Sequence, residues 1–327
     1  MLLALATSVF FGVSDFFGGY AARRIPTMAV TTVTYFAATA VLAVAAAAIS
    51  GVWSTGAVLV GIVTGAVALV GFVTFYAALA AGAISLVTPA VALLQSAVPV
   101  VIGVAALGER LGPQGWAGVA VALLAAPLLG IQRGEGQPTA GKPADDQPSN
   151  DQPGNNQRTD DQPGNDQLGD RRRGRLSRRA LVLTVVSGLS LGLSVVTLNA
   201  APADSGVVPV LVEVVLGSVV LGALVLATRR HRGLRRWAYG LGEPDGPVHW
   251  RSGLRHAFVT GALLGLGEGF LMAALRTDAL SVVAVVVGLY PLATVVLATL
   301  ILRERLSVSQ FGGVGLAIAG TVLLGLN

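Results

Sequence analysis

The chain has 327 residues, of which 54% are apolar and only 12% are charged. A soluble domain carries about 25% charged residues, so this composition excludes a soluble enzyme. Residues 25–108 contain no Asp, Glu, Lys, Arg or His. Because about 20 helical residues cross the ~30 Å core of a bilayer, that stretch must cross a membrane several times. A soluble domain with one anchor is therefore also excluded.

The sequence contains no cysteine, which excludes disulfides, thiolate metal sites, iron–sulfur clusters and cysteine catalysis. We expect no cofactor and no metal. The net charge of +5 fits basic cytoplasmic loops of a membrane protein better than a nucleic-acid site. The first residues lack a Lys/Arg-rich region and Asp15 interrupts the apolar run, so they predict a membrane helix rather than a cleaved signal.

Uncharged apolar segments of about 18–26 residues predict ten membrane helices. The five in the first half are Leu2–Tyr20, Thr27–Ile49, Thr55–Ala80, Ala83–Leu107 and Pro113–Ile131. The five in the second half are Ala180–Ala201, Gly206–Thr228, Leu254–Leu275, Ala279–Leu302 and Ser307–Leu326. The predicted fold class is an all-α polytopic membrane protein.

A hydrophilic insert separates the two sets of helices. Residues 132–179 are rich in Pro, Gly, Asn and Asp, and six arginines lie between Arg171 and Arg179. Such a composition buries too little apolar surface to fold, so it predicts a disordered linker with a charged end. The predicted units are therefore a five-helix unit over 1–131, the linker over 132–179 and a second five-helix unit over 180–327.

The two halves share short sequence matches. Ala77-Ala78-Leu79 recurs as Ala273-Ala274-Leu275, 196 residues later, and Glu109-Arg110-Leu111 recurs as Glu304-Arg305-Leu306, 195 residues later. A duplicated unit with five crossings enters the membrane from the opposite side in its second copy. The matches therefore predict two inverted five-helix repeats, which in transporters surround a central site.

These motifs, with Tyr290-Pro291 and the first-helix stretch Gly12–Gly19, resemble the EamA repeats of the drug/metabolite transporter superfamily. The resemblance implies a transporter of small metabolites or drugs, mostly outward. The chain departs from the family pattern at Ser96, where a proline is expected, at Arg303, where a glycine is usual, and in the long insert.

The distribution of basic residues predicts the orientation. Of the 22 Lys and Arg residues, all but Arg110 and Arg276 lie in loops on one face of the predicted topology. Basic loops stay in the cytoplasm, so we expect the linker inside and both termini outside a plasma membrane. The resemblance instead implies both termini inside, because ten-helix relatives are generally described that way.

Three acids lie within predicted membrane helices: Asp15, Glu213 and Glu268. Charged groups in hydrocarbon are costly, so each is a candidate for binding a cationic substrate or a proton. The alternative is that each carboxyl only bonds to a neighbouring helix. Further candidates for a site-facing side chain are Tyr76, Gln95, Asn199 and Tyr290.

Glu109 and Glu304 each follow a predicted helix and precede an arginine, Arg110 or Arg305. This position at the membrane surface favours a structural role, either an ion pair or a helix cap, over a role in binding.

The leading hypothesis is a secondary transporter that exports a small metabolite or drug-like molecule by alternating access. The sequence has no P-loop motif, so the energy is expected from a proton or substrate gradient. The alternatives are a flippase for a lipid-linked precursor and a membrane scaffold or receptor. An enzyme is not expected, because all three histidines lie in or at the edge of one polar loop. The cargo, the coupling ion and the oligomeric state are left open.

Overall fold

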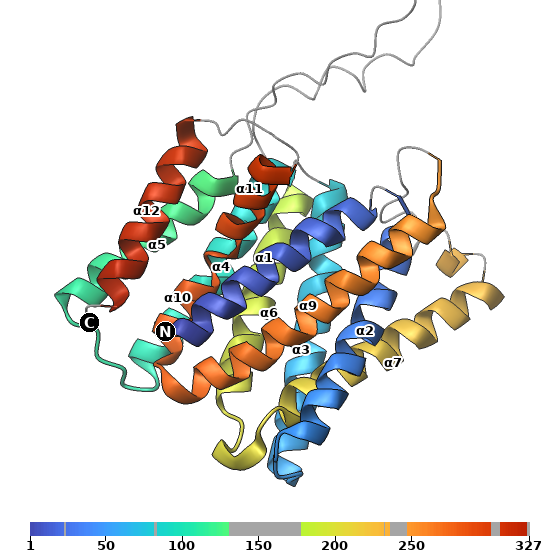
Figure 1. The fold of residues 1–327 in the computed structure, drawn as a ribbon, viewed down its shortest axis with the longest axis horizontal. Helices are drawn as coiled ribbons and strands as arrows, with labels where there is room; N and C mark the ends of the chain where they lie inside the picture. The colour runs from blue at the N-terminus through green and yellow to red at the C-terminus, as the bar shows by residue number, and fades with distance from the viewer. Residues whose placement is uncertain are drawn as a thin grey trace, which may run out of the picture. The chain divides into compact units, whose positions relative to one another are not determined.

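The computed structural model describes residues 1–22, 24–81, 84–130, 178–231, 233–235, 247–301 and 308–325. Its elements are all helical within these ranges (Figure 1). The first half of the chain forms α1 (Leu2–Ala22), α2 (Thr27–Ala48), α3 (Thr55–Ala81), α4 (Ile84–Ala105) and α5 (Pro113–Gly130). The second half forms α6 (Arg178–Asn199), the short η1 (Ala203–Ser205), α7 (Val208–Arg230), α9 (Trp250–Thr277), α10 (Leu280–Val287), α11 (Tyr290–Ile301) and α12 (Val308–Gly325).

The helices lie where the sequence predicts apolar segments. Among the described residues, six helices have the length and apolar composition of a membrane crossing: α1, α2, α3, α6, α7 and α9. Shorter apolar stretches of 10–17 residues lie in α4, in α5, over Leu280–Ala293 and in α12. The protein is therefore a multi-pass membrane protein. Of the predicted linker, only Arg178 and Arg179 are described, and they begin α6.

One predicted helix is interrupted. The segment Ala279–Leu302 was expected to be continuous, but α10 ends at Val287 and α11 begins at Tyr290. The cause is Pro291, which lacks an N–H group and whose ring clashes with the carbonyl four residues earlier, that of Val287. The break follows from the sequence once this proline is placed inside the helix.

The two halves interleave instead of packing as separate bodies. Met1–Gln132 and Leu176–Asn327 belong to one compact unit. Within it α1 packs along α9, and α6 packs along α3 in the same way. Helix α2 contacts α7 and α9, α4 contacts α6 and α10, α1 also contacts α11, and α5 lies beside α12 (Figure 1).

Glycines spaced four residues apart allow these helices to approach closely. A Cβ on Gly61 of α3 would lie 2.6 Å from the carbonyl oxygen of Pro209 in α7. A Cβ on Gly261 of α9 would lie 2.2 Å from the carbonyl oxygen of Thr34 in α2. Real Cβ atoms do not come so close to backbone, so only glycine fits at either position.

Hydroxyl side chains connect α3 to α6 and α1 to α9. The hydroxyls of Thr64 in α3 and Thr197 in α6 are 2.9 Å apart. On the corresponding pair, the Ser14 hydroxyl of α1 donates to the carbonyl oxygen of Thr260 in α9 at 3.0 Å. Each bond supplies a hydrogen-bond partner where lipid offers none.

Candidate functional site

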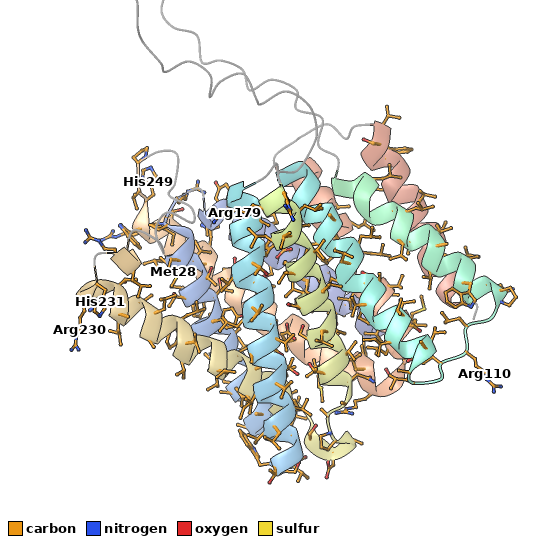
Figure 2. All side chains as sticks on the ribbon, turned by 180° about the vertical axis from the view of Figure 1, so that it is seen from behind. Met28, Arg110, Arg179, Arg230, His231 and His249 are labelled. Carbon is orange, nitrogen blue, oxygen red and sulfur yellow. The ribbon has the colours of Figure 1, made fainter. Side chains whose placement is uncertain are left out.

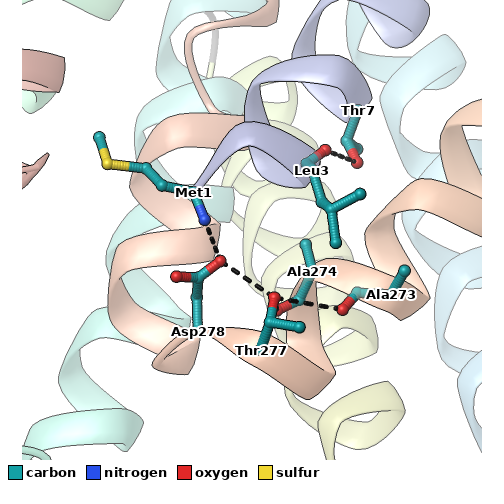
Figure 3. Close-up of polar contacts among 7 residues, drawn as sticks. All are labelled: Met1, Leu3, Thr7, Ala273, Ala274, Thr277 and Asp278. Atoms are coloured by element: carbon teal, nitrogen blue, oxygen red, sulfur yellow. Dashed lines mark hydrogen bonds and ion pairs between the residues drawn. The ribbon is translucent and has the colours of Figure 1, made fainter.

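Contacts between helix ends define one end of the bundle, which we call the Arg276 end. Arg276, near the end of α9, donates to the carbonyl oxygens of Ala201 and Pro202 at 2.7 and 2.8 Å, and contacts the Ser205 hydroxyl at 3.4 Å. The α-amino group of Met1 forms an ion pair with the carboxylate of Asp278, just beyond α9 (Figure 3). The start of α1, the end of α6, the start of α7 and the end of α9 therefore meet here.

The opposite end carries most of the described basic side chains, and we call it the basic end. Arg179, Arg230, His231 and His249 lie there, whereas Arg110 lies at the other end of the bundle (Figure 2). The labelled basic side chains are therefore divided between the two ends. The depth of each candidate residue can therefore be given as its distance along its helix from the Arg276 end.

Glu213 is buried near the Arg276 end. It is the sixth residue of α7, about 8 Å from the start of that helix at 1.5 Å per residue. Its side chain is 7% exposed. Its Oε2 atom has no hydrogen-bond partner among the described residues. Gly65 of α3 packs directly on its backbone, where a Cβ would lie 3.1 Å from the Glu213 Cα.

Glu268 lies at a similar depth on α9. It precedes Arg276 by eight residues, which places it about 12 Å into the bundle from the Arg276 end. Its side chain is half-buried. Helices α7 and α9 contact each other, so the two acids lie at a similar depth on contacting helices. The sequence predicted both acids as candidates.

Asp15 lies deeper, closer to the basic end. It follows Leu2, the first residue of α1, by thirteen residues, or about 20 Å. Its side chain is exposed although α1 packs against α9, α10 and α11. Tyr290 is the first residue of α11. The helix break therefore places Tyr290 at the start of a helix that contacts the one carrying Asp15.

The remaining predicted candidates are divided between this region and its surroundings. Gln95 is half-buried in the middle of α4 and adjoins Ser96, whereas Asn199 is the last residue of α6 and lies at the Arg276 end. Tyr76 belongs to α3, but its side chain lies outside the described part.

Ser96 was predicted only as a departure from the family pattern, and the structure places it at the helix break. Its side chain is 4% exposed. A Cβ on Gly288 would lie 1.8 Å from the Ser96 Oγ. Helix α4 therefore contacts the backbone between α10 and α11 directly. The missing proline at Ser96 was the available signal, although the sequence alone does not identify Gly288 as its partner.

Glu109 follows α4 at the Arg276 end. Its carboxylate accepts hydrogen bonds from the N–H groups of Leu280 and Ser281, at 2.6 and 3.0 Å, and so caps the start of α10. The side chain of its neighbour Arg110 is exposed. Glu304 and Arg305 lie outside the described residues. In the described ranges, no group of three or more His, Asp or Glu side chains could hold a metal ion.

The sequence profile of the EamA-like transporter family matches residues 178–326, from the first residue of α6 through α12. This match lies in the second half of the chain. It confirms the resemblance inferred from the motifs, and it supports a membrane transporter of the drug/metabolite superfamily. Members of this family are transporters rather than enzymes, which agrees with the expectation of no enzyme.

The fold of this EamA-like chain also resembles a solved one along its whole length. A crystal structure whose title reads only "Crystal structure of protein" has a TM-score of 0.63 and 15% sequence identity. The alignment covers 98% of this chain and 96% of that chain. At this identity the likeness shows the fold alone. No curated protein sequence matches the chain significantly.

Proposed function

We propose that this EamA-like protein is a secondary transporter that exports a small metabolite or drug-like molecule by alternating access. The observation that carries the proposal is the break between α10 and α11. Helix α10 has eight residues, so the break lies about 12 Å from the Arg276 end, within the hydrocarbon core. Interrupted helices near the bilayer midplane form the substrate sites of many secondary transporters.

The substrate site in this proposal surrounds the break. Tyr290 begins α11, which contacts the helix carrying Asp15, and Ser96 packs on Gly288 with Gln95 beside it. An accessible carboxylate and a phenol hydroxyl suit a substrate with a cationic or hydrogen-bonding group. Asp15 and Tyr290 are the residues that we assign to binding.

Ten crossings arranged as two inverted five-helix repeats are the architecture that we propose. The packing supports it, because α1 lies along α9 as α6 lies along α3. Gly71 and Gly267 are 196 residues apart and each packs on the first helix of the other half, against Leu191 and Phe11 respectively. Thr64 and Thr260 have the same spacing and each is hydrogen-bonded to that same first helix of the other half.

The orientation that we propose follows the charges. Basic residues near helix ends are retained in the cytoplasm, and Arg179 and Arg230 lie at the end opposite Arg276 (Figure 2). We therefore propose a plasma-membrane protein with its basic end in the cytoplasm. Export then runs from the basic end toward the Arg276 end.

The experiment compares compounds released by cells that express the wild-type protein, Asp15→Asn or Asp204→Asn, at matched membrane abundance. Asp204→Asn makes the same chemical change at an exposed position in η1 and is the control. We expect a compound that is released by the wild type and the control, and strongly reduced with Asp15→Asn. Equal release from all three proteins would reject the assigned site, and release no greater than from empty cells would reject export.

The same cells test the flippase alternative. A lipid-linked precursor that appears at the cell surface only when the protein is present, with no soluble compound in the medium, would replace the exporter by a flippase. Neither effect with any variant would favour the scaffold or receptor alternative.

A further inference from the structure

We propose that Glu213 of α7 and Glu268 of α9 form a single proton-binding site, in which the two carboxyl groups share one proton that is exchanged during the transport cycle. The release step rests on the proposed transport function, whereas the shared proton does not. The ligand is a proton, and the coupling is one proton for each cycle.

The two acids lie at a similar depth in the bundle. Glu213 follows Ser205 by eight residues, and Glu268 precedes Arg276 by eight residues. Ser205 and Arg276 are in contact at 3.4 Å, and α7 leaves this contact as α9 approaches it. Both carboxyls therefore lie about 8–12 Å from the Arg276 end, on helices that contact each other.

The pair lacks a counter-ion. In the described part of the chain the ion pair is between Met1 and Asp278, and neither acid takes part in one. Glu213 is 7% exposed and its Oε2 has no hydrogen-bond partner there. Two neighbouring carboxylates in hydrocarbon repel each other and lack solvation. One proton removes one charge and replaces the repulsion by an O–H···O⁻ bond, which is a strong hydrogen bond.

The helices around the pair supply few other groups that titrate. Helix α3 presents Gly61 and Gly65 to α7. Helix α2 contributes Tyr35, which packs on Gly217, one turn beyond Glu213. Helix α1 contributes Asp15 on the side of the basic end, and the sequence of α10 has no ionisable residue. Helix α6 also contacts α9, and its charged residues, Arg178 and Arg179, lie in its first turn, away from the Arg276 end.

The fold itself does not require acids at these positions. Gly65 and Gly261, 196 residues apart, occupy equivalent packing positions: Gly65 contacts Glu213, and Gly261 contacts Thr34. The residue 196 positions before Glu268 is Phe72. A threonine and a phenylalanine thus stand in the first half where the second half has two carboxyls. Because the same packing forms without acids, a purely structural role does not account for the pair.

Exchange of the proton needs no other reactant. A carboxylate takes a proton from water at one side of the membrane, becoming a carboxyl, and returns it to water at the other side. Glu213 is closed off by the glycine contacts of α3, so release requires α7 to separate from its neighbours. Alternating access supplies such a movement.

The first test follows protonated carboxyl groups by infrared difference spectroscopy during a pH titration of the purified protein. In the wild type we expect the pair to lose its two protons in two steps separated by more than about one pH unit, as coupled acids do. Glu213→Gln and Glu268→Gln should each leave a single step. The control Asp15→Asn should retain both steps. Two independent, unshifted titrations, or two steps that survive Glu268→Gln, would overturn the shared proton.

Folding is checked separately, because Glu213→Gln alters a buried side chain. Glu213→Asp and Glu268→Asp retain an acid at each position and should retain two steps in monodisperse protein. Loss of both steps in monodisperse aspartate variants would contradict a site defined by two carboxyls.

The second test measures the dependence of export on external pH in cells that express wild type or Glu268→Gln. We expect the wild-type rate to change with external pH and the variant rate to be insensitive to it. Insensitive wild-type export with an intact two-step titration would overturn proton exchange. Absence of any export would defeat the proposed function, while the two-step titration would still support the proton site.

Discussion

Glu109 caps the first turn of α10: its Oε1 accepts a hydrogen bond from the N–H of Leu280 at 2.6 Å. Its Oε2 accepts the N–H of Ser281 at 3.0 Å. The first N–H groups of a helix have no partner within the helix, and negative charge is favoured there. Gly108, at φ 69°, takes the left-handed conformation that turns the chain into this position. The first half of the chain thereby caps a short helix of the second half.

Replacing Glu109 by Gln should destabilise the protein. The amide has one acceptor oxygen instead of two and no charge, so one N–H of α10 loses its partner. We expect a loss of about 1–2 kcal/mol in stability, which is typical of a lost helix cap. Thermal unfolding in detergent measures the loss. The control is Arg110→Gln at the exposed neighbour, and equal effects of the two variants would contradict the cap.

The contact between Ser96 and Gly288 predicts a paired result. Gly288→Ala should destabilise the protein strongly and abolish export, because its Cβ would lie 1.8 Å from the Ser96 Oγ. Ser96→Gly combined with Gly288→Ala removes the clashing hydroxyl and should restore much of the lost stability. A double-mutant cycle of unfolding temperatures measures the coupling. Simple additivity of the two changes would show that α4 does not contact the break.

Close packing of α9 on α2 predicts a contrast between two glycines. Gly261→Ala places a Cβ 2.2 Å from a backbone oxygen of α2, whereas a Cβ on Gly315 of α12 meets nothing within 4 Å. Alanine is favoured over glycine within a helix by about 1 kcal/mol. We therefore expect Gly315→Ala to leave stability equal or higher, and Gly261→Ala to lower yield and unfolding temperature. The opposite order would contradict the packing.

The sequence contains enough to predict the helices but not their partners. Long uncharged runs predict the positions of the described helices, and Pro291 contains the signal for the break after Val287. Local patterns do not show that Glu109 reaches Leu280, 171 residues away. That contact depends on how the two halves interleave.

The candidate site divides in the same manner. Asp15, Glu213 and Glu268 are identified by charge within apolar runs, because such positions are costly. Their local patterns do not show that the helix carrying Glu213 contacts the helix carrying Glu268, or that the helix carrying Asp15 contacts the one that begins with Tyr290. Composition does not predict which helices contact each other.

The orientation can be tested directly because the chain contains no cysteine. Single cysteines replace Arg110 near the Arg276 end and Arg230 at the basic end, both of which are exposed. An impermeant maleimide is applied to intact cells, and labelling is compared with that in permeabilised cells. We expect Arg110→Cys to react from outside and Arg230→Cys to react only after permeabilisation, because basic ends remain in the cytoplasm.

The reverse labelling pattern would support the arrangement with both termini inside, which the family resemblance implies. The Arg276 end would then face the cytoplasm, and the Glu213–Glu268 pair, about 8–12 Å from that end, would lie nearer to the cytoplasm than Asp15. Reaction of both cysteines from outside in one cell population would mean that the protein inserts in both directions. The labelling therefore determines from which side the proton pair is closer to water, independently of any transport measurement.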